Sequence, residues 1–149
     1  MMKIKRLLAL RNIFRTIPVY FCVLASPHKK LVEMDIERYC QITQFQGNLF
    51  VSLNWFLTED MTIRNLLQHR MKYPTRSRKC WMHYIIARIL WKPLDSLYIN
   101  TLDIGGGLYI QHGFSTIISA KKIGENCRIF QQVTIGYREN ETPVLEDYA

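Results

Sequence analysis

The chain lacks an apolar run long enough to cross a membrane. Arg11 and Arg15 interrupt the apolar stretch near the N-terminus. Roughly ten uninterrupted residues follow from Ile17, whereas a membrane-spanning helix needs about 20. Basic residues precede this segment, so contact of an amphipathic helix with a membrane surface is one alternative, but packing against the following helices is favoured. The sequence therefore predicts a cytoplasmic protein.

Clusters of metal-binding residues are also lacking. The four cysteines are far apart in the sequence, at positions 22, 40, 80 and 127. Cys80 and His83 have the spacing of half a zinc site, but no second pair accompanies them. We therefore expect buried free thiols and no bound metal.

Acidic side chains are scarce relative to basic ones. The chain has 12 Asp and Glu against 20 Lys and Arg, which gives a formal net charge of +8. Such a charge attracts anionic ligands, acidic glycans or lipid headgroups. The basic residues are scattered over the N-terminal half, apart from a cluster at 76–79, and no nucleic-acid-binding motif accompanies them. We expect no nucleic-acid partner.

The first 95 residues favour helices. Thr58 or Asp60 can cap a helix that ends at Pro74, and Pro93 ends the last one. Helices are expected over residues 31–46, 49–57, a stretch that ends at Pro74, and 77–91.

Beyond them, an apolar residue recurs almost every sixth position. Strands have a period of two and helices a period near 3.6, so neither explains this spacing. A period of six is typical of a parallel β-helix, in which each short rung points one large apolar residue into a narrow shaft. One step, from Ile110 to Ile117, is a residue longer than the others. The repeat positions are Tyr98, Ile104, Ile110, Ile117, Ile123, Ile129 and Ile135.

The words IGGGLYIQH, IGENCRIFQQVTIG and PVLEDYA resemble the hexapeptide-repeat acyltransferases. The closest likeness is to their serine acetyltransferase-like branch, which includes polysaccharide O-acetyltransferases. The resemblance implies an α+β fold: an N-terminal α-helical domain, residues 1–95, followed by a left-handed parallel β-helix of hexapeptide repeats, residues 96–149. It also implies a homotrimer. The last repeat stops in mid-rung, so a C-terminally truncated β-helix is expected.

His112 is the predicted catalytic residue. It lies within the long step of the repeat, where an extra residue must bulge outward and present its side chain. On the residues alone, a histidine that only satisfies a turn is the favoured interpretation. The word GLYIQH, however, resembles the family's active-site pattern Gly-Leu-x-Ile-x-His. This resemblance implies that His112 is the general base, which takes the proton of an acceptor hydroxyl while that hydroxyl attacks acetyl-CoA.

Acetyl-CoA is accordingly the expected co-substrate, and the resemblance places it near Gly136 and Tyr137. Three departures from serine acetyltransferases bear on the acceptor: Gln111 replaces an aspartate before the histidine, Thr142 replaces a second histidine, and Leu97 replaces an acidic residue. They favour a hydroxyl acceptor other than serine, most plausibly a sugar of a surface polysaccharide. Serine O-acetylation and a catalytically incomplete fragment are the alternatives.

Overall fold

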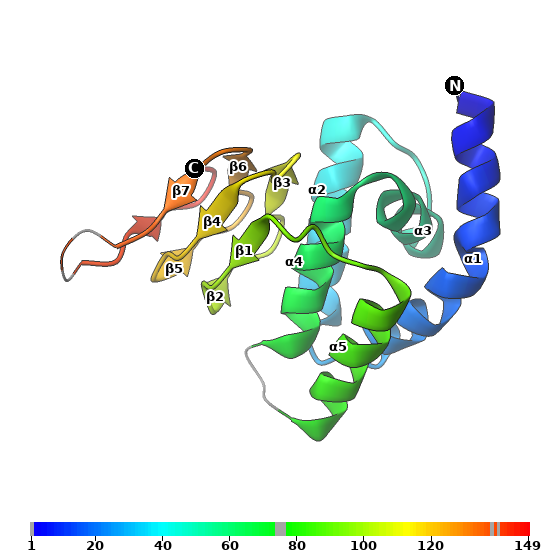
Figure 1. Ribbon diagram of the computed structural model, residues 1–149, viewed down its shortest axis with the longest axis horizontal. Coiled ribbons are helices and arrows are strands. Elements are labelled where there is room, and N and C mark those ends of the chain that lie inside the picture. The colour runs from blue at the N-terminus through cyan, green and yellow to red at the C-terminus, as the bar shows by residue number, and fades with distance from the viewer. Residues whose placement is uncertain (1, 74–76, 138, 140) are drawn as a thin grey trace.

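Five helices make up the first part of the chain in a computed structural model that describes residues 2–73, 77–137, 139 and 141–149. They lie together at one end of the molecule, with the strands at the other (Figure 1). Their bounds are α1 Met2–Leu24, α2 Lys29–Thr43, α3 Leu49–Glu59, α4 Met61–Lys72 and α5 Arg78–Leu90.

Short polar side chains begin three of these helices, as capping chemistry requires. Asn48 accepts a hydrogen bond from the Val51 amide at 3.0 Å at the start of α3. Asp60 accepts one from the Thr62 amide at 2.8 Å at the start of α4. The predicted cap at Asp60 is thus confirmed, and α5 agrees with the predicted helix to within a residue at each end. Pro74, the predicted end of α4, lies outside the described residues.

The first helix packs against the others, as the sequence analysis favoured. It contacts α3 and α5. Asn54 of α3 donates a hydrogen bond to the Ala9 carbonyl at 3.0 Å. The Arg15 guanidinium donates to the Leu90 carbonyl and lies 4.4 Å from the centre of the Trp91 ring. The Asn54 hydrogen bond thus joins α1 to α3, and the Arg15 contacts join α1 to the C-terminal end of α5.

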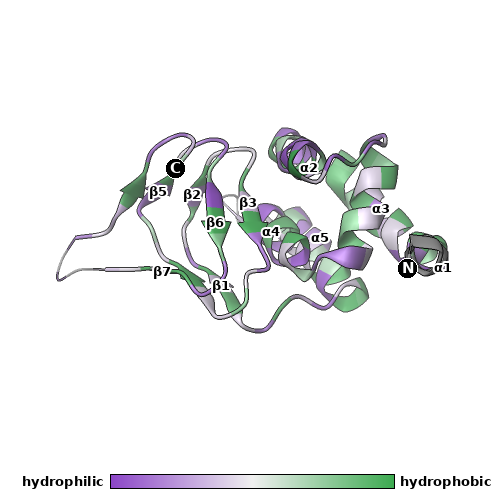
Figure 2. Cartoon of the chain, turned by 90° about the horizontal axis from the view of Figure 1, so that it is seen from above, coloured by the Kyte–Doolittle hydropathy of each residue, from purple (hydrophilic) through white to green (hydrophobic). Residues whose placement is uncertain are grey.

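The described residues beyond α5 contain eight short strands, all paired in parallel. They form three sheets, in the orders β1-β4-β7, β2-β5-β8 and β3-β6. Strands β1, β2 and β3 are nearest to the helices, and later strands lie farther away (Figure 2). The bounds are β1 Leu97–Ile99, β2 Asp103–Ile104, β3 Tyr109–Gln111, β4 Thr116–Ile118, β5 Lys122–Ile123, β6 Arg128–Phe130, β7 Thr134–Ile135 and β8 Val144–Leu145.

The predicted left-handed parallel β-helix is wrong. The strands are two or three residues long, and over the described part of the chain they form three small sheets with no closed or coiled β-helix. The period of six also does not mark one uniform interior. Ile110 and Ile123 are fully buried, whereas Tyr98 is 57% exposed and Ile117 is 41% exposed. In β1 the neighbouring Leu97 is buried instead, because side chains alternate between faces and a shift of one residue reverses them.

A buried ion pair connects the helices to the first strands. Asp35 of α2 and Arg70 of α4 are 2% and 3% exposed, and two N–H···O bonds of 2.9 and 3.0 Å join them. Asp35 also accepts hydrogen bonds from the amides of Gly107 and Leu108, at 2.9 and 3.1 Å. Burial raises the pKa of Asp35, and the charge of Arg70 and these hydrogen bonds oppose the rise.

Arg70 completes this connection from the other side. Its guanidinium donates to the carbonyls of Ile104 and Gly105, at 2.5 and 2.6 Å. The two charged side chains therefore bind four backbone groups of β2 and of the turn between β2 and β3. The same hydrophobic core runs from the helices into the strands, from Val19 to Ile129. The domain boundary that the sequence analysis placed after residue 95 lies in the connection between α5 and β1.

Candidate functional site

His112 occupies a corner of the chain directly after β3. Its imidazole is exposed, and its backbone has a φ of 63°, a conformation that residues other than glycine seldom adopt. Gly113 follows with a φ of 57°. A Cβ atom on Gly113 would lie 2.7 Å from the Thr62 side chain and 3.0 Å from that of Leu97, so only glycine fits there. Close packing beneath the corner thus leaves the histidine directed outward.

Two buried hydroxyl groups hold the strand that leads into this corner. The Tyr39 hydroxyl lies 3.3 Å from both the amide nitrogen and the carbonyl oxygen of Ile110, and 3.0 Å from Thr62 Oγ1. Thr62 Oγ1 is in turn 3.0 Å from the Ile110 carbonyl and 2.6 Å from Asp60 Oδ1. Burial, and secondly the charge of Asp60, raises the pKa of Tyr39, so the phenol stays protonated and can donate. This network fixes the backbone two residues before His112.

The outer face of the β3-β6 sheet adjoins the corner and carries a cation and an aromatic ring. Arg128 donates a hydrogen bond to Gln111 Oε1 at 2.5 Å. Its guanidinium lies 4.8 Å from the centre of the Phe130 ring and 5.4 Å from that of Tyr109. Phe130 is 49% exposed. This face, which we call the Arg128 face (Tyr109, Gln111, Arg128 and Phe130), can offer an amide, a positive charge and an apolar surface to a ligand.

The structure does not bring the predicted acetyl-CoA residues next to His112. Gly136 and Tyr137 follow β7, whereas His112 precedes β4, and these two strands run in parallel. The residues therefore lie at opposite ends of the β1-β4-β7 sheet. Among the described residues, a Cβ atom on Gly136 would meet only Thr134, at 3.9 Å, and the Tyr137 side chain is 73% exposed. The described residues therefore leave space at this corner and an accessible ring.

A cavity that the sequence analysis did not anticipate lies at the N-terminal ends of β1 and β4. Its volume is about 430 Å³, and its lining includes Asp95, Ser96 and Ser115. Ser96 and Ser115 are brought together by strand pairing, and the Thr116 amide donates to the Ser96 carbonyl at 3.1 Å. The Asp95 carboxylate is 2.9 Å from the ammonium group of Lys92. No local sequence pattern reveals a site assembled from residues so far apart.

The described residues hold neither a metal-binding cluster nor a membrane-spanning helix. Among them, no cluster of three or more His, Cys, Asp or Glu side chains is arranged to hold a metal ion. All four cysteines are free as expected; Cys22, Cys80 and Cys127 are buried, whereas Cys40 is only partly buried. No helix there, α1 included, combines the length and the apolar character needed to span a bilayer.

The sequence analysis missed the residues that hold the backbone of the candidate site in place. Tyr39 and Thr62 hold the His112 corner, and Asp35 with Arg70 holds the preceding turn. Each lies on a helix far in sequence from the strands it contacts, so no spacing rule could pair them.

In comparisons with known proteins, no family model matches the chain and no curated protein matches its sequence.

Proposed function

We propose that this protein is an acetyl-CoA-dependent O-acetyltransferase whose acceptor is a hydroxyl group, most plausibly of a sugar in a surface polysaccharide. The observation that carries the proposal is the exposed imidazole of His112, held on a tightly packed corner beside the Arg128 face. The proposal also includes a homotrimer as the active form and the cytoplasm as its compartment.

In the proposed reaction, His112 acts as the general base. Imidazole can accept and release a proton near neutral pH, which suits the activation of an alcohol. His112 takes the proton of the acceptor hydroxyl while the hydroxyl oxygen bonds to the acetyl carbon. As the carbon–sulfur bond breaks, His112 gives the proton to the departing thiolate. The acetyl group is what acetyl-CoA supplies when it is bound, and no covalent enzyme intermediate is needed.

The charge around Gln111 favours a sugar over serine as the acceptor. Arg128 donates a hydrogen bond to Gln111, the residue before His112, and so places a positive charge beside Gln111. A positive charge there disfavours the ammonium group of a free amino acid. A neutral or acidic sugar has no such group, and it can hydrogen-bond to the Gln111 amide. The exposed Phe130 ring adds an apolar surface for a sugar ring.

The separation of the two corners supports a site shared between copies of the chain, for which we propose a homotrimer. Within one chain, His112 and Gly136 lie at opposite ends of the β1-β4-β7 sheet. The open space at Gly136 and the exposed Tyr137 ring fit a bound ligand there. A neighbouring copy could bring its own Gly136 corner to His112. In this arrangement Gly136 and Tyr137 bind acetyl-CoA across the interface between subunits.

Thiol release from acetyl-CoA tests the proposal. The protein is incubated with acetyl-CoA and either acidic oligosaccharides or serine, and free thiol is followed over time. We expect release with a glycan and none with serine. His112→Asn should lower the rate by at least about 100-fold, the lower end of what a general base contributes. The control is Lys122→Ala on β5, an exposed side chain away from the corner, which should retain the wild-type rate.

Each opposing result identifies what is wrong. Release with serine alone would contradict the glycan acceptor and support the serine alternative. An active protein whose rate is unchanged by His112→Asn would refute the role of His112. If no acceptor gives release and the folded protein neither forms a trimer in light scattering nor binds acetyl-CoA, the chain is a catalytically incomplete fragment.

A further inference from the structure

The outer side of α1 carries a continuous stripe of large apolar side chains. They recur at intervals of three and four residues, which keeps them on one side of the helix. Phe14 is 83% exposed and Phe21 is 63% exposed, so the described residues leave this side open. The helix itself lies at the end of the molecule farthest from the strands (Figure 1). This set, called the α1 stripe below, consists of Leu10, Phe14, Ile17, Phe21 and Leu24.

The buried side of the same helix holds smaller side chains. Its polar members are paired, since Asn12 donates to Thr58 Oγ1 at 3.3 Å and Thr16 donates to Asn54 Oδ1 at 2.7 Å. From residue 9 onwards, the buried side chains of α1 are Ala9, Asn12, Thr16, Val19, Cys22 and Val23. Leucine and phenylalanine are normally among the most buried residues. A helix that turns its largest apolar groups outward therefore presents an interaction surface.

An apolar groove adjoins the α1 stripe. It lies between α1 and α3, has a volume of about 300 Å³ and shares Leu10 with the stripe. Phe45 and Trp55 stack in its wall, with ring centres 5.3 Å apart. Asn54 also lines it, but its amide is bonded to the Ala9 carbonyl. The groove therefore widens the apolar surface of α1 toward α3.

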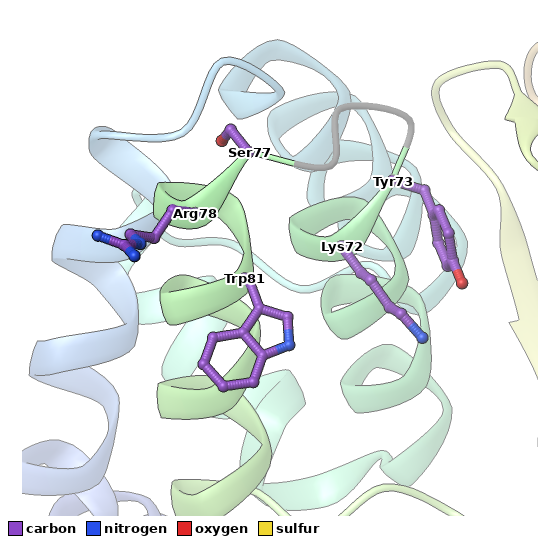
Figure 3. A pocket seen from close by; sticks show the side chains of 5 residues that line it. All are labelled: Lys72, Tyr73, Ser77, Arg78 and Trp81. Carbon is purple, nitrogen blue, oxygen red and sulfur yellow. The ribbon is translucent and has the colours of Figure 1, made fainter.

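An exposed ring elsewhere on the helices has different surroundings. Trp81 of α5 is 59% exposed and lines a cavity of about 490 Å³ between α4 and α5. The side chains around it are polar or basic: Lys72, Tyr73, Ser77 and Arg78 (Figure 3). One exposed ring among polar groups is ordinary protein surface, whereas the α1 stripe joins five apolar side chains.

The charged side chains of α1 are all positive. Three of them are in the first two turns, where the helix dipole disfavours positive charge, so helix stability does not account for them. Arg15 is bonded to the Leu90 carbonyl, whereas Arg11 is exposed and has no ion-pair partner among the described residues. The adjacent α3 has one acidic residue, Glu59, at its last position. The charged residues of α1 are Lys3, Lys5, Arg6, Arg11 and Arg15.

We propose that the α1 stripe binds the surface of an anionic lipid bilayer. The helix lies in the plane of the interface, with Phe14 and Phe21 among the acyl chains and the basic side chains at the anionic headgroups. A second copy of this chain fits less well, since two α1 helices placed face to face bring like charges together. Binding through α1 leaves the strands, at the other end of the molecule, open to solvent (Figure 1). It does not depend on the acetyl transfer proposed above.

Vesicle flotation of the full chain tests the proposal, because protein that floats is bound to lipid. The vesicles are phosphatidylcholine with about one-third phosphatidylserine, and pure phosphatidylcholine for comparison. We expect binding to the anionic vesicles and binding at least about tenfold weaker to the neutral ones. Raising NaCl from about 0.05 to about 0.5 M should weaken the anionic binding, because salt screens the attraction.

Exposed side chains of α1 provide the variants, and circular dichroism checks that each still folds. Phe14→Ser and Phe21→Ser should each weaken binding to anionic vesicles at least about tenfold, and Arg11→Gln about fivefold. The matched controls are Phe114→Ser and Lys122→Gln, which change an exposed ring and an exposed cation at the strand end of the molecule. Both controls should bind as the wild type does.

Three results would overturn the proposal: no flotation of the wild type with anionic vesicles, equal binding to neutral ones, or a loss in Phe114→Ser as large as in Phe14→Ser. Light scattering without lipid identifies the competing occupant. If the vesicles do not bind and Phe14→Ser lowers the molecular mass of the wild-type assembly, the α1 stripe is a contact between copies of the chain.

Discussion

Replacing Arg70 by methionine should destabilise the protein more than any exposed substitution. Methionine keeps much of the apolar volume but leaves the Asp35 carboxylate buried without its counter-charge. Breaking a buried ion pair from one side costs about 3–5 kcal/mol. Arg70 also satisfies the carbonyls of Ile104 and Gly105, and a buried acceptor left unpaired costs about 1–3 kcal/mol. The costs overlap, because the site relaxes, so we expect a loss of about 4–6 kcal/mol of unfolding free energy.

Urea unfolding, followed by circular dichroism and tryptophan fluorescence, measures this loss. The set of variants is Arg70→Met, Asp35→Leu and the double substitution. The double variant should lose less than the sum of the single losses, because neither charge is then buried alone. Lys29→Met is the control: its ion pair with Glu33 is 44% and 36% exposed, and its loss should cost about 0.5 kcal/mol or less.

Two results would refute this reasoning. If Arg70→Met costs less than about 1 kcal/mol, the pair does not hold the β2-β3 turn against the helices. If the double variant loses the full sum, the charges contribute independently and the uncompensated carboxylate is not the source of the cost.

Three further predictions concern single side chains. His69→Gln should remove a pH dependence of the unfolding free energy. The pKa of His69 is about 4 in the folded state, below its unfolded value of 6.5. The wild type therefore keeps its full stability above pH 6.5 and loses about 3 kcal/mol more than the variant between pH 6.5 and 4, as urea titrations would measure. Gly107→Ala should cost at least about 1 kcal/mol in thermal unfolding, because φ is 79° and the new Cβ would lie 2.5 Å from Asn126 Oδ1; an unchanged melting temperature would contradict this. Tyr39→Phe should cost about 1–3 kcal/mol in urea, because it removes the hydroxyl that bonds the Ile110 backbone; a loss below about 0.5 kcal/mol would show that Thr62 suffices.

The helices show how far local chemistry extends. Asp60 was recognisable as a cap because a short carboxylate suits the free amides at a helix start, and the structure has that hydrogen bond. Pro93 stands just beyond the end of α5, where a missing N–H ends helices. The six-residue repeat was a less reliable guide to which side chains are buried. Spacing of six identified apolar positions but not the faces they occupy, and Tyr98 and Ile117 are on the outside.

By itself, the sequence determined the helices from 29 to 90, the strands beyond them and an exposed His112, because caps, prolines and short-range spacing act within a few residues. Only the tertiary structure decided the three small sheets and the Asp35–Arg70 pair. Burial and charge pairing depend on which distant residues become neighbours. A local sequence pattern does not predict which distant residues become neighbours, because a shift of one residue in strand pairing moves the same side chain from the core to solvent.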